Sequence, residues 1–127
     1  MIIATLLALL FFGGSGSAVM TDGIEHLHDS IKSELSKGSA RDKALDVVKT
    51  MKGITKDYGK ADGKQEKTLI DLLENHDSSA TDLQNHIAEA NERRVEYQRH
   101  MLDLRSDLKR TLTINEWNKV FAMDKAK

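Results

Sequence analysis

The 127-residue chain contains no cysteine and no proline, and only six of its residues are aromatic. Without cysteine it can form no disulfide, no thiolate metal site and no lipid-modified cysteine after an export signal. Without proline, nothing removes a backbone donor from a helix, and the many Ala, Leu, Lys, Glu and Asp residues favour long helices. Because so few aromatic side chains limit the size of a core, this composition is more typical of a coiled coil than of a globular enzyme.

The chain also lacks a strong net charge and any recognisable catalytic motif. Its formal charge is −1, which gives no overall attraction to nucleic acid. No nucleophile stands at a suggestive spacing from a base, and Gly13, Gly14 and Gly16 match neither nucleotide-binding fingerprint. We therefore predict a protein that is not an enzyme, has no cofactor and does not bind nucleic acid.

Residues 2–20 contain no charged side chain, and residues 2–12 are nearly all large and apolar. An apolar stretch of this length followed by small residues predicts a cleaved signal peptide. Alternatively the 19 residues are an uncleaved anchor, since as a helix they would span roughly 28 Å, close to the thickness of a bilayer core. A third interpretation is a buried helix of a soluble protein. The first two predict a protein in the bacterial inner membrane facing the periplasm, or one free in the periplasm.

The next segment shows helical periodicity. Ile24, Leu27, Ile31 and Leu35 share one face, and Leu45, Val48 and Met51 continue the same seven-residue register after Gly38. This pattern predicts one helix over about residues 21–56, bent near Gly38. Alternatively Gly38 ends one helix, and Ser39 to Asp42 form the capping box of the next.

Residues 58–64 (YGKADGK) contain two glycines and no large aliphatic residue, which predicts the loop of a helical hairpin. The segment that follows, about residues 65–111, has a coiled-coil-type seam with steps of four and three. The seam residues that we expect to form the interaction surface are Leu69, Leu73, Leu83, Ile87, Tyr97, Met101, Leu104 and Leu108.

A turn near Ala61 would make facing residue numbers sum to about 122, so that Tyr97 lies opposite Ile24 or Glu25 and Ile87 opposite Leu35. Near the C-terminus, Thr113 and Glu116 form a capping box that predicts a short helix over about residues 114–123. The expected fold is all-α: residues 21–127 form one domain, a long antiparallel two-helix hairpin with a short C-terminal helix. Such a hairpin buries little area, so we expect self-association or a protein partner.

A polar cluster near the start of the first helix holds Glu25, His26, His28 and Asp29. Imidazole and carboxylate are ligands for divalent metals, but the spacing does not match HExxH or another specific metal motif. The alternative is a polar cluster in which Glu25 or Asp29 pairs with Arg94, which the turn near Ala61 would bring opposite.

Residues 92–110 contain six basic residues, diluted by four acids. Among them Arg105, Lys109 and Arg110, together with Trp117, are candidates for contact with anionic lipid headgroups at a membrane surface. A solvated helix face is the alternative interpretation.

Residues 112–116 (LTINE) resemble the LTxxQ motif of the Spy and CpxP group of small exported helical-hairpin stress proteins. Members of that group have two such motifs ending in Gln, whereas this chain has one, ending in Glu116. The ending Leu-Thr-x-x-Glu-Trp-x-x-Val-Phe also resembles uncharacterised bacterial membrane-anchored helical proteins. The first resemblance implies binding of unfolded clients or of metal. The function predicted from the sequence is protein–protein contact through the hairpin of an anchored or exported envelope protein, and the alternative is a Spy-like stress protein.

Overall fold

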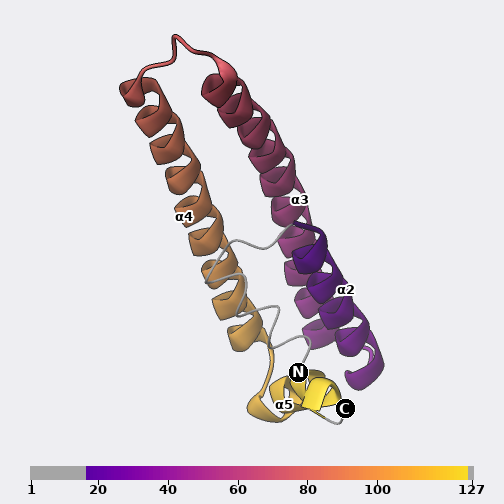
Figure 1. Cartoon of the computed structure of the whole chain (residues 1–127). Coiled ribbons are helices and arrows are strands. Elements are labelled where there is room, and N and C mark those ends of the chain that lie inside the picture. The colour runs from indigo at the N-terminus through magenta and orange to yellow at the C-terminus, as the bar shows by residue number, and fades with distance from the viewer. Residues whose placement is uncertain (1–16, 126–127) are drawn as a thin grey trace.

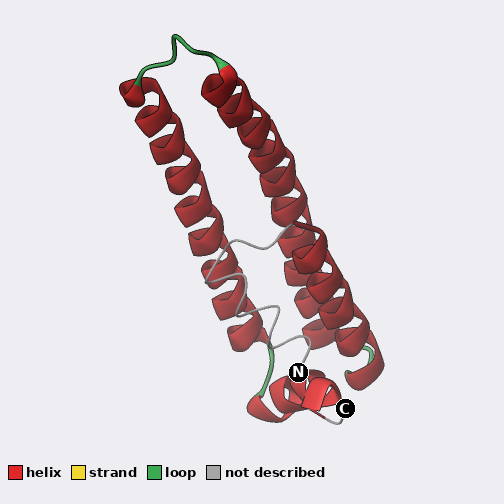
Figure 2. Ribbon diagram, in the orientation of Figure 1, coloured by secondary structure: helices red, strands yellow, loops and turns green. Residues whose placement is uncertain are grey.

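The computed structural model describes residues 17–125, with side chains for residues 21–121. This part of the chain contains four helices and no strand (Figures 1 and 2): α2 (Ser17–Glu34), α3 (Ser39–Glu74), α4 (Ala80–Thr111) and α5 (Ile114–Lys125). The predicted all-α hairpin with a short C-terminal helix is therefore confirmed. None of the described helices is both long and apolar enough to cross a membrane. The signal peptide or anchor predicted for residues 1–20 falls almost entirely outside the described residues.

The predicted position of the hairpin turn is wrong. Residues 58–64 are helical within α3, and the chain turns instead between Asn75 and Ser79. Gly59 and Gly63 weaken a helix by only about 1 kcal/mol each, and neither is needed for a positive φ here. The ring of Tyr58 stacks on that of Tyr97 of α4 with centroids 4.3 Å apart, which offsets that cost.

The turn at residues 75–79 has clear local signals. Ser79 is the N-cap of α4: its hydroxyl accepts a hydrogen bond from the Asp82 amide, and the Asp82 carboxylate accepts one from the Ser79 amide. The Asn75 side chain accepts a hydrogen bond from the Asp77 amide within the turn. These bonds satisfy backbone donors that a helix start leaves without partners.

The first predicted helix is two helices. α2 ends at Glu34 and α3 begins at Ser39, with Gly38 between them at φ 159° and ψ −176°. A side chain rarely adopts this backbone conformation, so glycine suits the reversal that folds α2 back along α3. The alternative of two separate helices is correct, although α2 already ends at Glu34 and Gly38 is instead the N-cap of α3. No side-chain bond caps α3, so the capping box expected at Ser39 to Asp42 does not form.

The core lies where α2, α3 and α4 run together, at the end of the hairpin away from its turn (Figure 1). The apolar face predicted for α2 is buried, since Ile24, Leu27, Ile31 and Leu35 all belong to the core. Val48 and Met51 of α3 face them, and the remaining buried members are Ala44, Tyr97, Met101, Leu108, Leu112 and Val120. Burial of these side chains is the main source of stability for the bundle.

The short C-terminal helix begins where the sequence predicts. The Thr113 hydroxyl accepts from the Glu116 amide at 3.1 Å, and the Glu116 carboxylate accepts from the Thr113 amide at 2.9 Å. α5 then crosses the end of the bundle and packs against α2 (Figure 1). The buried Ser30 hydroxyl of α2 donates a hydrogen bond to the buried Val120 carbonyl, which ties the two helices together.

Candidate functional site

Three hydrogen bonds and one ring stack fix the register of the α3–α4 hairpin. They join Thr55 to Tyr97, Gln65 to His86, Ala61 to Arg93 and Tyr58 to Tyr97. The numbers of these facing residues sum to between 151 and 155 instead of the predicted 122. Because the register depends on where the chain turns, Tyr97 faces α3 rather than Ile24, and Ile87 is not opposite Leu35.

A buried polar layer crosses the middle of the hairpin. The Thr55 hydroxyl and the Tyr97 phenol lie 2.9 Å apart, and both residues are buried. Burial is the main cause that raises the pKa of Tyr97, as it is for the pKa of Tyr58, to which the nearby Asp62 carboxylate adds. Both phenols are therefore neutral at physiological pH, and the layer fixes which turn of α3 faces which turn of α4.

Beyond this layer the described part of α2 no longer runs along the hairpin. The Lys52 amine lies 2.5 Å from the Glu25 carboxylate, and α2 begins eight residues before Glu25, level with about residue 60 of α3. We define the distal half of the hairpin as the residues of α3 after 60 and of α4 before 93. Here His86 Nε2 of α4 lies 2.9 Å from the Gln65 backbone oxygen of α3, and at the edge of this half Arg93 donates a hydrogen bond to the Ala61 carbonyl.

Large apolar side chains are exposed on this distal half. Ile70 is 47% exposed, Leu73 64% and Ile87 49%; we call these three residues the distal apolar surface. Ile70 lies eighteen residues, or five turns, beyond Lys52, so it leaves α3 in the direction that Lys52 takes toward α2. Ile87 lies five turns before Arg105, whose guanidinium lies over Trp117 of α5. Both isoleucines therefore face the side of the hairpin that α2 and α5 cover further down.

The predicted seam of α4 is divided between these two regions. Tyr97, Met101 and Leu108 are buried in the core, and Leu104 is partly buried against it. Leu69 and Leu83, in the distal half, are half-buried. Leu73 and Ile87 are exposed in the isolated chain, which identifies the part of the seam that is available for contact.

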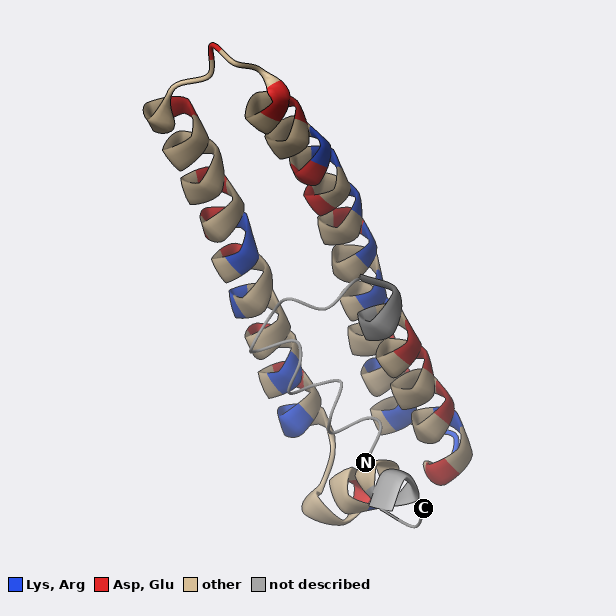
Figure 3. Cartoon of the chain, viewed as in Figure 1, with Lys and Arg blue, Asp and Glu red and all other residues tan. Residues whose placement is uncertain are grey.

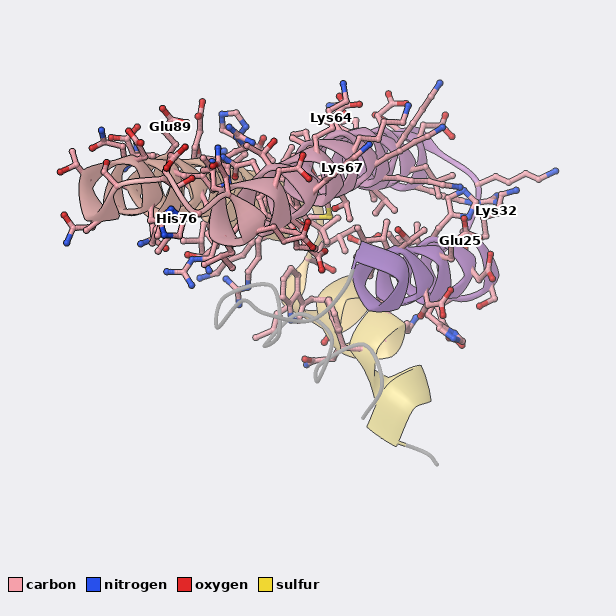
Figure 4. All side chains as sticks on the ribbon, turned by 45° about the horizontal axis from the view of Figure 1, so that its top comes forward. Glu25, Lys32, Lys64, Lys67, His76 and Glu89 are labelled. Atoms are coloured by element: carbon pink, nitrogen blue, oxygen red, sulfur yellow. The ribbon has the colours of Figure 1, made fainter. Side chains whose placement is uncertain are left out.

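The distal half is also acidic. Residues 66–89 contain six acids and a single base, Lys67. Figure 3 shows acidic residues on both helices near the turn, whereas basic residues lie along the middle of α3. The exposed His76 stands in the turn itself, with its Nδ1 3.3 Å from Asp77, and Glu89 lies on the distal part of α4 (Figure 4). A partner that carries positive charge would therefore be attracted to this region.

The four metal candidates do not form a cluster. Glu25 pairs with Lys52, His28 Nδ1 lies 3.4 Å from the Asp29 carboxylate, and His26 is exposed. Within residues 17–125 no group of three His, Cys, Asp or Glu side chains is placed to hold a metal ion. The predicted pairing of Arg94 with Glu25 or Asp29 is wrong, since the corrected register puts α3 in place of α2 opposite this part of α4.

Three of the four lipid-contact candidates meet at the junction of α4 and α5. Arg105, Lys109 and Trp117 line a pocket of about 370 Å³ together with Leu112, Ile114 and Asn118, and we call it the elbow pocket. Arg110 does not belong to it. Its guanidinium pairs with Asp107, and it lines a different groove, against the first turns of α3.

No protein-family model, curated protein or solved structure matches this chain.

Proposed function

We propose that this protein is a non-enzymatic component of the bacterial cell envelope that binds a partner helix along the distal apolar surface. The observation that supports this most directly is the exposure of Ile70, Leu73 and Ile87 on the distal half of the hairpin. Single exposed apolar residues are ordinary, but several gathered on one face are typical of an interaction surface. Within residues 17–125 no third helix packs along this half of the hairpin.

The complement of this surface is an amphipathic helix with an apolar stripe and basic residues beside it. Such a helix would lie against the distal apolar surface, with its apolar stripe on Ile70, Leu73 and Ile87. The acidic residues of the distal half would pair with its basic flanks and disfavour an acidic partner. A second copy of this chain would bring two acidic ends together, so we expect a different protein to bind more strongly than self-association.

The uncharged residues 2–20 support the proposed location outside the cytoplasm, either anchored in the inner membrane or released into the periplasm. Fractionation of cells that express the full chain measures this directly. Recovery with the membrane after a high-salt wash supports the anchor, and recovery in the periplasm supports cleavage. Retention in the cytoplasm contradicts both locations without affecting the binding surface.

Site-specific photo-crosslinking tests the contact. A photoreactive side chain at position 73 of the full chain should yield a discrete cross-linked product whose mass identifies the partner or a second copy. The control is the same side chain at Lys60, which is exposed on α3 outside the distal apolar surface. Equal products at both positions, or none at position 73, would contradict the proposal.

A variant series separates contact from stability. Changing Ile70, Leu73 and Ile87 to Ser should abolish the cross-linked complex, while the unfolding free energy changes by about 0.5 kcal/mol or less per site because these residues are exposed. Val95→Ser is the matched control, since Val95 is 46% exposed on α4 and lies about 200° around the helix from the buried Tyr97. Loss of the complex in the control would show that the surface is not specific.

The Spy-like alternative makes a different prediction for the same surface. A client-binding protein would hold unfolded chains of unrelated sequence, whereas the proposed protein selects one helical partner. Suppression of aggregation of an unfolded test protein, lost in the triple Ser variant, would favour the alternative.

A further inference from the structure

The elbow pocket combines two features that ordinary surface grooves do not share. Its walls are apolar, formed by the buried Leu112, the half-buried Trp117 and Ile114, which is 76% exposed. Its rim has two cations, Arg105 and Lys109, which stand four residues apart on α4 and therefore on the same side of that helix. Its volume of about 370 Å³ falls within the range of ligand-binding pockets.

The junction of the two helices holds the pocket open. Only Leu112 and Thr113 separate α4 from α5, and the capping box between Thr113 and Glu116 sets the direction in which α5 leaves. This direction brings Ile114 and Trp117 beside the last turns of α4. The pocket is thus built by short-range structure and does not depend on a flexible loop.

No acidic side chain among residues 21–121 neutralises the two cations. Among the described residues neither Arg105 nor Lys109 forms an ion pair, whereas the neighbouring Arg110 pairs with Asp107. Arg105 lies over the Trp117 ring, with its Cζ 5.2 Å from the ring centroid. A guanidinium stacked in this way keeps its N–H edge available to a carboxylate or phosphate. Glu116, the nearest acid along α5, already accepts the Thr113 amide.

We propose that the elbow pocket binds an amphipathic anion, with a carboxylate or phosphate head between Arg105 and Lys109 and an apolar chain against Trp117 and Ile114. Leu102 extends the apolar track for such a chain, since it is 47% exposed and precedes Lys109 by two turns on the same side of α4. The ligand is a free fatty acid or a phospholipid, which share this chemistry. The proposal is independent of the contact proposed for the distal apolar surface.

Trp117 is the only tryptophan of the chain and lines this pocket, so tryptophan fluorescence comes from a single position beside the site. The full chain is titrated with dodecanoate below its micelle concentration, with dodecyl maltoside as the uncharged amphiphile and with inorganic phosphate as the bare anion. Calorimetry under the same conditions supplies an affinity that does not depend on tryptophan emission. We expect a saturable emission change with dodecanoate, and neither uncharged amphiphile nor phosphate should reproduce it. An equal response to dodecyl maltoside, or no response to dodecanoate, would overturn the proposal.

Two variants separate binding from structure. Arg105→Gln combined with Lys109→Gln should weaken dodecanoate binding by about tenfold or more, because two charge-assisted hydrogen bonds are lost. Arg110→Gln, with its cation in a different groove, should bind like the parent. Since Arg105 also stacks on Trp117, Ile114→Gln provides a second test that leaves both cations and the stack in place. Undiminished calorimetric affinity in both the double variant and Ile114→Gln would refute the site.

Vesicles distinguish the two sources of the ligand. Sedimentation with phosphatidylglycerol vesicles, reduced in the Arg105/Lys109 double variant and by salt, would indicate a membrane lipid. Dodecanoate binding without such a difference would indicate a free fatty acid. Both results support an amphipathic anion. A double variant that matches the parent toward dodecanoate and toward vesicles would exclude it.

Discussion

Replacement of Tyr97 by Phe probes the polar layer that sets the register of the hairpin. The change removes one hydroxyl from a buried pair in which the Thr55 and Tyr97 oxygens lie 2.9 Å apart. The aromatic ring at position 97 remains and still stacks on that of Tyr58. The Thr55 hydroxyl then remains fully buried without its partner on α4.

The size of the effect follows from that loss. Leaving a buried polar group without its partner costs about 1–3 kcal/mol, so we expect Tyr97→Phe to lower the unfolding free energy by roughly 1–2 kcal/mol. For about 110 residues this corresponds to a decrease in Tm of at least about 4 °C. Thr55→Val should have a similar effect. The double variant removes both polar groups and should cost clearly less than the sum of the two, with a coupling of about 1 kcal/mol.

Urea denaturation followed by circular dichroism measures all four proteins of this cycle. Thr50→Val is the matched control, because the exposed Thr50 hydroxyl bonds to the Asp46 carbonyl within α3 and faces no other helix. Its unfolding free energy should change by about 0.5 kcal/mol or less. If the effects of Tyr97→Phe and Thr55→Val on the unfolding free energy simply add, the two hydroxyls do not interact. The Thr55–Tyr97 hydrogen bond would then no longer support the α3–α4 register.

Three further predictions concern pH and the ends of the helices. Burial raises the pKa of Tyr97 and of Tyr58 above that of an unfolded tyrosine. The stability that the two neutral phenols contribute is therefore complete below about pH 10 and is lost as the pH rises through the folded-state pKa values. The urea midpoint, measured between pH 8 and 11, should fall only at the alkaline end, and Tyr97→Phe should reduce that fall. Gly38→Ala should lower the unfolding free energy by about 1–3 kcal/mol, because the backbone conformation at this position is unfavourable for a residue with a side chain. A steric clash is not the cause, since an added Cβ would meet no atom within 4 Å. A change in Tm near zero in thermal denaturation would show that the chain reversal tolerates another φ at position 38. Ser79→Ala should cost about 1 kcal/mol through the loss of the α4 cap, with Ser36→Ala, outside any helix and exposed, as the neutral comparison in the same assay.

The sequence predicts helix type and helix faces well because both depend on local spacing. The buried positions Ile24, Leu27, Ile31 and Leu35 follow the 3.6-residue period, and the α5 capping box needs only Thr113 and Glu116. The interaction of nearby side chains is enough to specify these features.

The position of the turn could not be derived in the same way. Two glycines at 59 and 63 suggest a loop, whereas the polar run of residues 75–79 lies inside an apolar register that continues from Leu69 to Leu83. The choice depends on tertiary contacts, above all Tyr58 and Tyr97, which are 39 residues apart in sequence. The Ser79 and Asp82 capping box was the available signal. Because the turn sets the register, the error also misplaced Arg94 relative to Glu25.

The elbow pocket was also predictable only in part. Their residue types made Arg105, Lys109 and Trp117 candidates for contact with an anionic headgroup, and the structure brings the three together. The same criterion also selected Arg110, which points to another groove, and it missed Leu112 and Ile114 as walls. Helical spacing alone indicates that Arg110 leaves α4 about 100° away from Lys109. Only the direction of α5 shows that the pocket forms on the Lys109 side of α4.

The most direct test of the register is the distance between spin labels on Lys60→Cys and Glu92→Cys. Both residues are exposed, and the chain has no other cysteine. With the turn at residues 75–79 they lie on adjacent antiparallel helices, so the labels should be within about 30 Å of each other. If the chain instead turned near residue 61 and continued as one helix to residue 92, the labels would stand roughly 48 Å apart. That longer distance would contradict the hairpin register and, with it, the distal apolar surface.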